Sequence, residues 1–193
     1  MLKYISILFF LILLLFVACT QNPRLHSVTN ADFTVFVEST GYITDAEKFG
    51  WSFVQKTVND FDVVRGATWR KPDAKNIALA DYPVTQVSYN DALAYCEWSN
   101  TKIPTYEHYW ELVKPDRRVI HIDANFLISA DEANYIGNTW DITETWNDRK
   151  EIRLAGGSYL CNPKTCDGTN PNRELYVSPD TGNSNISFSV LLF

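Results

Sequence analysis

An apolar run near the start of the chain constrains the fold most, because it removes the first residues from any globular domain. The run extends from Tyr4 to Ala18, and Lys3 is the only charged side chain before it. A helix that spans a bilayer needs about 20 apolar residues, so this run is short for a membrane span. Its size is typical of the apolar region of a signal peptide. We therefore predict that residues 1–18 are a signal peptide.

Cys19 directly follows the small residues Val17 and Ala18, and a polar segment comes after it. Small residues before a cysteine resemble a bacterial lipobox, in which the cysteine becomes the lipidated first residue of the mature protein. We expect Cys19 to be lipidated, which would anchor an exported protein to the membrane of the bacterial cell envelope. An ordinary signal peptide with a chance cysteine is the alternative. Residues 19–27 are predicted to be a tether.

Three cysteines remain after Cys19, and three cannot all pair within one chain. Cys96 stands on an apolar background within a predicted helix, which is typical of a buried, inert thiol. Cys161 and Cys166 are five positions apart. That spacing by itself leaves two alternatives open, a structural disulfide that closes a small loop and a pair of metal ligands.

Residues 28–193 are predicted to form one α+β domain with much loop, in a monomeric protein. One helix is expected to begin at Thr29 and to stop at Gly41, and another to run from Ser88 to Asn100. A short third helix is expected after Thr105. Short strands are predicted at 118–122 and 126–128 from their apolar residues. The net charge of −6 offers no basic surface for a nucleic acid.

Several segments in order resemble the formylglycine-generating enzyme (sulfatase-modifying factor) family. They extend over residues 28–188, nearly all of the predicted domain. The segments are VTNADF (28–33), AEKFGWSF (46–53), GATWRKP (66–72), VSYNDALAYC (87–96), GNTWD (137–141), GGSY (156–159), the pair Cys161 and Cys166, and the closing segment SNISF (184–188). A collinear set of this kind is more specific than any one of its members.

The resemblance implies a C-type-lectin-like α+β fold that is poor in regular secondary structure. It also implies an oxidase that uses O2 and Cu(I) to convert a substrate cysteine to formylglycine. The partner would be an exported sulfatase with a Cys-x-Pro-x-Arg segment, or another cysteine-containing peptide. The matching copper ligands are Cys161 and Cys166, whose soft thiolates suit Cu(I). Ser158 matches the active-site serine of the family.

A second metal site is implied by the same resemblance. The residues that match the family's Ca2+ ligands are Asn134, Gly137, Thr139 and Asp141, and oxygen ligands of this kind suit Ca2+. Asp141 replaces the usual Glu and is one methylene shorter. Trp69 and Arg70 lie in a segment that is usually near the active site, and we expect them to bind substrate. A core aromatic and a surface charge are the alternative interpretation of this pair.

The sequence also departs from the family's pattern. The usual first part of the domain is absent, and the run of arginines that normally follows the second cysteine is missing after Cys166. A non-catalytic surface lipoprotein of the gliding-motility type, with the same fold used as a binding or structural module, is therefore an alternative function. A thiol redox protein that uses Cys161 and Cys166 is another. Reactive pairs usually have an electropositive setting, and Lys164 is the only basic residue near this pair.

Overall fold

The computed structural model describes residues 22–193, so the predicted signal peptide (1–18) and the predicted lipidation site Cys19 lie outside the described residues. The elements are β1 (Arg24–Ser27), α2 (Asn30–Thr40), α3 (Asp45–Phe49), β2 (Trp51–Thr57), β3 (Asp60–Arg65), α4 (Tyr89–Ser99), α5 (Tyr106–Val113), β4 (Trp140–Trp146), β5 (Ile152–Ala155), β6 (Tyr176–Val177) and β7 (Ile186–Leu192). Within residues 22–193, none of the helices combines the length and the hydropathy that a membrane span requires.

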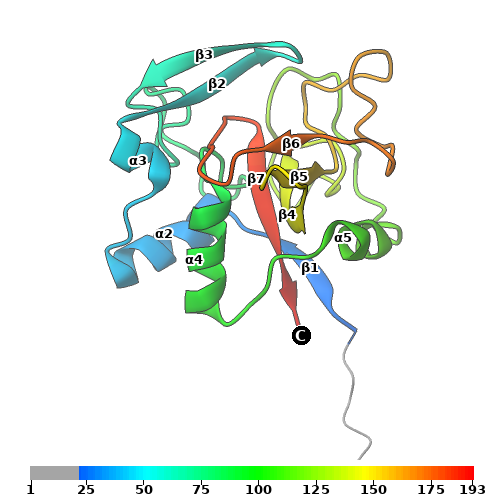
Figure 1. Ribbon diagram of the computed structural model, residues 1–193, viewed down its shortest axis with the longest axis horizontal. Helices are drawn as coiled ribbons and strands as arrows, with labels where there is room; N and C mark the ends of the chain where they lie inside the picture. The colour runs from blue at the N-terminus through cyan, green and yellow to red at the C-terminus, as the bar shows by residue number, and fades with distance from the viewer. Residues whose placement is uncertain (1–21) are drawn as a thin grey trace, which may run out of the picture.

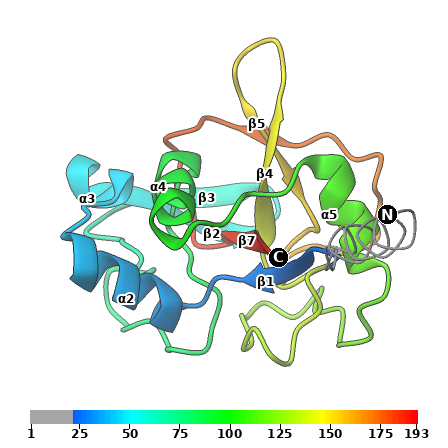
Figure 2. The same cartoon turned by 90° about the horizontal axis from the view of Figure 1, so that it is seen from below.

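A five-stranded mixed sheet organises the domain, with the strand order β1-β7-β4-β5-β6. Strand β7 pairs in parallel with β4 and antiparallel with β1, so the last strand of the chain lies inside the sheet. Helices α2 and α4 lie to one side of β7 and helix α5 lies to the other, while the separate β2–β3 hairpin lies above the sheet (Figure 1). Figure 2 shows the same separation of α2 and α4 from α5 from below. The predicted α+β fold, poor in regular structure, is confirmed.

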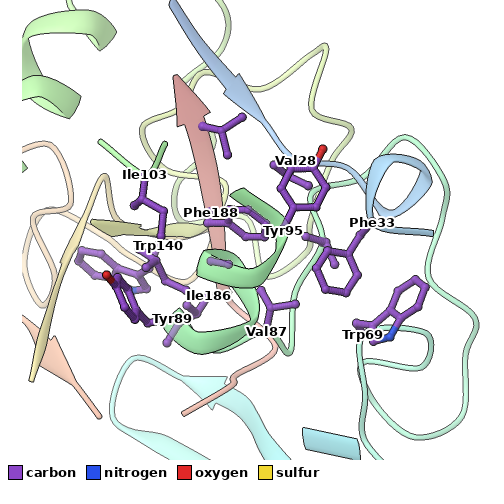
Figure 3. Packing of buried hydrophobic residues seen from close by; sticks show 14 of the residues in the cluster. Val28, Phe33, Trp69, Val87, Tyr89, Tyr95, Ile103, Trp140, Ile186 and Phe188 are labelled. Carbon is purple, nitrogen blue, oxygen red and sulfur yellow. The ribbon is translucent and has the colours of Figure 1, made fainter. Parts of the chain in front are cut away.

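Strand β7 separates two kinds of packing because its side chains alternate between the faces of the sheet. Phe188 is fully buried on the face toward α2 and α4, where its ring centroid lies 5.4 Å from that of Tyr95 and 6.4 Å from that of Phe33. Figure 3 shows these rings packed together. The opposite face carries the buried hydroxyl groups of Ser187 and Ser189. One strand therefore supports an aromatic core on one side. On the other side it carries two buried hydroxyls and Leu191, which joins a second apolar cluster with residues of α5.

The predicted helices form where their capping residues are. Thr29 and Asp32 make reciprocal hydrogen bonds that begin α2, and Ser88 and Asp91 do the same for α4. Helix α3 was not expected, although Thr44 forms the same capping box with Glu47. A helix of five residues is too short to give a periodic apolar pattern, so its cap was the only signal in the sequence.

Two expectations about the chain's organisation were wrong. Residues 24–27 were predicted to be tether, but they form β1 against β7 and bury Leu25, so the folded domain begins at Arg24. The predicted strands at 118–122 and 126–128 are turns and loop, apart from a single bridge between Val119 and Ala133. Val119 is 64% exposed, so its β-branched side chain does not mark a sheet face.

The pair of Asp32 and His26 makes the start of α2 sensitive to acid. A hydrogen bond from His26, supported by hydrogen bonds from Thr29, lowers the pKa of Asp32 to about 2. A carboxyl with a lower pKa in the folded state contributes stability above its ordinary pKa of 3.8, and that contribution is lost as the pH falls toward 2.

We predict that Asp32→Asn lowers the free energy of unfolding at pH 7 by about 1 kcal/mol, a low value because a third of the side chain is exposed. The difference from the parent should shrink steadily between pH 4 and pH 2, as measured by urea unfolding. Glu38→Gln, which changes an exposed acid on the same helix, is the matched control. A difference that stays constant over this pH range would contradict the assignment.

Candidate functional site

A cavity of about 390 Å³ lies between the β2–β3 hairpin and the loop that follows β5. The hairpin contributes aromatic residues to its wall, and the loops opposite contribute the three predicted active-site residues. The lining residues used below are Phe53, Gln55, Asn59, Phe61, Trp140, Ser158, Cys161, Cys166, Arg173, Asn183 and Asn185. The structure therefore brings Ser158, Cys161 and Cys166 together at one cavity, as the sequence predicts.

Glycines position the cysteine loop after β5. Gly156 and Gly157 have φ angles of 83° and 73°, which side chains with a Cβ rarely adopt. A Cβ on Gly156 would collide with the hydroxyl of Tyr109, and a Cβ on Gly157 would lie 2.5 Å from the Cα of Gly168. The chain after Cys166 therefore crosses directly over the segment before Ser158. This crossing folds both cysteines back toward the same point.

The structure presents Cys161 and Cys166 as a disulfide, with Cα atoms 4.8 Å apart. Both cysteines line the cavity, and the backbone amide of Ser158 donates to Sγ of Cys161 over 3.3 Å. In this oxidised form neither sulfur is a thiolate, so metal binding requires reduction first. After reduction the two sulfurs would lie next to each other at the cavity wall. That is the donor set that Cu(I) prefers, so the residues present fit the ion.

Asn185 is a further residue of the site, and the sequence had not marked it as functional. Its side-chain amide donates to the hydroxyl oxygen of Ser158 over 3.2 Å, and both side chains are buried. The backbone carbonyl of Asn185 accepts a hydrogen bond from the backbone amide of Trp140, which fixes Asn185 at the junction of β4 and β7. Since the amide group donates to Ser158, the hydroxyl proton of Ser158 is free to point elsewhere. Position 185 lies within the segment 184–188 that resembles the family's closing segment, and this was the only available signal.

Arg173 is the only charged residue among those that line the cavity. It is also the only basic residue after Cys166 in the sequence. Its carbonyl accepts hydrogen bonds from the hydroxyl of Tyr106 and from the guanidinium of Arg153, which hold this loop in place. The Arg173 guanidinium lies 5.7 Å from the ring centroid of Trp140. A cation at the cavity that the two cysteines line would favour a thiolate over a thiol there.

The other polar groups of the cavity are mostly neutral side-chain amides. Gln55, Asn59, Asn183 and Asn185 all line it, and the amide of Asn183 donates to that of Gln55 over 2.8 Å. Amides can both donate to and accept from a peptide backbone. Together with the aromatic wall they give the cavity both hydrogen-bonding and apolar surface.

The four residues predicted to bind Ca2+ are only partly gathered. Asn134, Thr139 and Asp141 line a second cavity of about 10 Å³, but Gly137 does not. Burial raises the pKa of Asp141 to about 7. The hydroxyl of Ser189 donates a hydrogen bond of 2.8 Å to the Asp141 carboxylate, which lowers the pKa but does not offset the effect of burial. Arg118 lines the same cavity, and its guanidinium is held by Asp116 over 2.8 Å. The oxygen donors suit Ca2+, but this nearby positive charge opposes a divalent ion.

Trp69 and Arg70, predicted to bind substrate, do not line the cavity of the cysteines. They line a separate cavity beside α2. Trp69 is buried against Phe33, and the Arg70 guanidinium lies 4.1 Å from the ring centroid of Trp69. A role for this pair in binding the peptide at the cysteines has no support from their position.

Comparisons with known proteins place the first half of the domain in a family. A family model described as sulfatase-modifying factor enzyme 1-like domain matches residues 24–113. The formylglycine-generating enzyme of Mus musculus is 41% identical over 105 residues, which cover 45% of this chain and 28% of that protein. An inactive Cα-formylglycine-generating enzyme 2 of Bos taurus is 37% identical over 103 residues, 44% of this chain and 34% of that protein. The chain therefore spans about a third of the length of these relatives.

A solved structure extends the likeness to the rest of the domain at the level of fold alone. PvdO from Pseudomonas aeruginosa superposes with a TM-score of 0.59 and 10% identity, over 86% of this chain and 77% of that one. The family model, which ends at residue 113, does not reach Ser158, Cys161 or Cys166. The site residues therefore depend on the geometry described above. By this match, residues 24–113 belong to the formylglycine-generating enzyme (sulfatase-modifying factor) family.

Proposed function

We propose that the protein is a copper-dependent oxidase that converts a cysteine of a substrate polypeptide to formylglycine. A sulfatase-type Cys-x-Pro-x-Arg segment is the proposed substrate. One observation carries the proposal: Ser158, Cys161 and Cys166 meet at a single cavity whose walls are aromatic side chains and neutral amides. A thiol-bearing peptide would enter such a cavity with its backbone polar groups satisfied.

Cys161 and Cys166 would hold Cu(I) after reduction, and the bound ion would supply a centre that accepts a third thiolate and reacts with O2. The substrate cysteine would be that third thiolate. Arg173 supplies the positive charge at the cavity that favours its deprotonation. Because both cysteines are buried, bulk water has little access to the sulfurs.

Ser158 would act through its hydroxyl, which Asn185 orients. The hydrogen bond from the Asn185 amide occupies a lone pair of the Ser158 oxygen, so the serine proton can be donated toward the reacting sulfur or oxygen. Asn185 is thus a positioning residue in this proposal, and Ser158 is the catalytic one.

The oxidation balances only with an added reductant. Conversion of the substrate thiol to an aldehyde releases the sulfur as hydrogen sulfide and removes two electrons from carbon. Reduction of O2 to one carbonyl oxygen and one water consumes four electrons, so a thiol reductant must supply the other two. The same reductant would open the disulfide between Cys161 and Cys166.

The proposed substrate is an exported protein because the chain itself is proposed to be exported. Its first 18 residues have the composition of a signal peptide, and Cys19 stands where a lipid anchor would be attached. An envelope location would expose the site to O2 and to exported sulfatases.

A non-catalytic surface lipoprotein is the second candidate function. One observation favours it: a relative that is 37% identical over 103 residues carries the name of an inactive enzyme. The disulfide between Cys161 and Cys166 would then be structural, closing the loop over Ser158.

The oxidase is tested by incubating the full chain, reduced with a thiol and loaded with Cu(I), in air with a Cys-x-Pro-x-Arg peptide. Mass spectrometry should detect the aldehyde. Cys161→Ser and Cys166→Ser should abolish it, because each leaves one thiolate for copper. Ser158→Ala and Asn185→Ala should each lower kcat about tenfold or more, as expected for the loss of one buried hydrogen bond.

Cys96→Ser is the matched control, since Cys96 is a buried cysteine in α4 outside the cavity. Aldehyde formation that survives Cys161→Ser would contradict the proposed ligands. Tight copper binding without aldehyde would point to another substrate. The absence of both copper binding and aldehyde formation would favour the non-catalytic lipoprotein.

The state of the thiols gives a separate prediction. Burial raises the pKa of Cys96 to about 11, so this thiol should not react in the folded protein. With Cys19→Ser, protein isolated in air should show no reactive thiol when native, one when unfolded and three when unfolded and reduced. Titration with an aromatic disulfide reagent measures each number. Three thiols in unfolded, unreduced protein would exclude the disulfide.

We also propose that Asn134, Thr139 and Asp141 bind Ca2+ weakly, with Arg118 limiting the affinity. Adding Ca2+ at about ten times its Kd should stabilise the fold by about 1.4 kcal/mol and raise Tm by about 3–5 °C. Mg2+ should have no such effect, and Asp141→Asn should remove it. Asp131→Asn, at an exposed acid, is the control. An unchanged Tm in saturating Ca2+ would contradict this site.

A further inference from the structure

Arg173 is a positive charge without a counter-charge in the wall of the cavity that the cysteines line. Among the described residues, the rest of that wall consists of neutral amides, hydroxyls, sulfurs, aromatic rings and aliphatic groups, and it contains no aspartate or glutamate. A concave site with charge of one sign attracts a ligand group of the opposite sign. The cavity therefore favours a substrate that carries a negative charge.

The guanidinium of Arg173 has two nitrogens that are open to a ligand. Nη1 and Nη2 make no hydrogen bond within the part of the chain that the structure describes, and neither is closed to solvent, whereas Nε is. Arg173 also forms none of the ion pairs within residues 22–193. The planar fork of a guanidinium matches the two oxygens of a carboxylate. A carboxylate is therefore the anion that this open edge would bind best.

Contacts around Arg173 keep this edge at the cavity. The Cζ atom lies 5.7 Å from the ring centroid of Trp140, which is buried in the same wall. The backbone carbonyl of Arg173 accepts hydrogen bonds from the hydroxyl of Tyr106 over 3.2 Å and from the guanidinium of Arg153 over 2.9 Å. A loop that is fixed before binding loses less conformational entropy when a ligand binds.

The rest of the cavity strengthens an ion pair and limits its distance from the reacting thiol. Leu154, Leu160, Leu175 and Val177 also line the cavity, and an ion pair is stronger beside apolar groups than in bulk water. The volume of about 390 Å³ is near the lower end for ligand pockets. A carboxylate that reaches Arg173 must therefore lie close to the substrate cysteine.

These two requirements select among substrate peptides. The substrate thiol must reach Cys161 and Cys166 while a carboxylate reaches Arg173, all within one cavity. Each residue of an extended chain spans only about 3.3–3.6 Å, so the acid is best placed next to the cysteine. A Cys-x-Pro-x-Arg segment has a free position on each side of its cysteine. Its arginine finds no carboxylate in the described wall of this cavity.

We propose that Arg173 selects substrates with an aspartate or glutamate next to the reacting cysteine. The side-chain carboxylate accepts hydrogen bonds from Nη1 and Nη2 of Arg173, and this pair holds the cysteine at the sulfurs of Cys161 and Cys166. The inference rests on the proposed function, because it takes the same peptide into the same cavity. The binding step itself needs neither copper nor O2.

Peptides in which serine replaces the reacting cysteine test recognition without chemistry. The full chain, in the disulfide form, free of copper and held in mild detergent because of its apolar start, is titrated by calorimetry with acetyl-Ala-Ser-Glu-Pro-Ala-Arg-amide. Replacement of the peptide glutamate by glutamine should weaken binding about tenfold, as expected for the loss of a charge-assisted contact. The pair acetyl-Glu-Ser-Ala-Pro-Ala-Arg-amide and its glutamine counterpart shows on which side of the cysteine the acid is read.

Variants of the protein assign the preference to Arg173. Arg173→Gln should bind the glutamate and glutamine peptides equally, whereas Arg173→Lys should keep a smaller preference for glutamate because it keeps the charge but not the fork. Lys164→Gln is the matched control, since Lys164 is an exposed cation between the two cysteines that does not line the cavity. It should keep the full preference.

A charge reversal separates loss of recognition from loss of the fold. Arg173→Glu should bind the peptide with lysine in place of glutamate more tightly than the glutamate peptide, which a misfolded variant could not do. Equal binding of the glutamate and glutamine peptides by the parent, on both sides of the cysteine, would overturn the proposal. A preference for glutamate that persists in Arg173→Gln would overturn it as well.

Turnover of the matching cysteine peptides separates this inference from the oxidase. Preference for glutamate in the serine peptides without aldehyde from the cysteine peptides would keep Arg173 as a recognition residue and contradict the oxidase. Aldehyde formation without any preference would do the reverse. If Arg173 acts only on the substrate thiolate, Arg173→Gln would slow all cysteine peptides alike and leave the binding of serine peptides unchanged, and this result also overturns the proposal.

Discussion

The parallel pairing of β4 with β7 is the contact on which the rest of the structure depends. Strand β7 comes last in the chain, and it reaches the centre of the sheet only by lying beside β4. This pairing puts Phe188 into the aromatic core and Ser189 against Asp141 on the opposite face. It also sets Asn185, just before β7, beside Ser158. A change that loosened this pairing would therefore disturb the core and the site together.

The site adds a second constraint, the crossing of two chain segments at Gly157 and Gly168. Neither position has room for a Cβ, because each would lie within 2.6 Å of the other's Cα. The backbones of Gly157 and Gly168 are in direct contact, with no side chain between the two glycines. This contact holds Cys161 and Cys166 near Ser158. Backbone packing thus places the buried pair, and this geometry is present in the disulfide form.

Local signals in the sequence were sufficient for some features and not for others. Capping boxes at Thr29 and Ser88 marked α2 and α4 because a cap acts within one helical turn. The strands predicted at 118–122 and 126–128 do not form, because a short apolar run does not reveal whether a sheet edge is available for pairing. Residues 24–27 have no strand signal of their own in the sequence, because the pairing partner of β1 lies at the other end of the chain. For the candidate site, GGSY and the cysteine pair marked Ser158, Cys161 and Cys166, which line one cavity. Arg173 and Asn185 reach the same cavity through loops with no periodic pattern.

The family match and the site occupy different halves of the domain. Residues 24–113 carry the match and supply α2, α4 and α5, which build the core. Ser158, both cysteines and Arg173 come later, in loops whose conformation depends on a few close contacts. A closely packed core tolerates only substitutions that preserve its packing. Loops on the surface of a stable fold can change their residues, and so their chemistry, without loss of the fold. A chain built in this way can keep the architecture of the matched half while loops outside that half set the chemistry of the cavity, in which Arg173 is the charged lining residue.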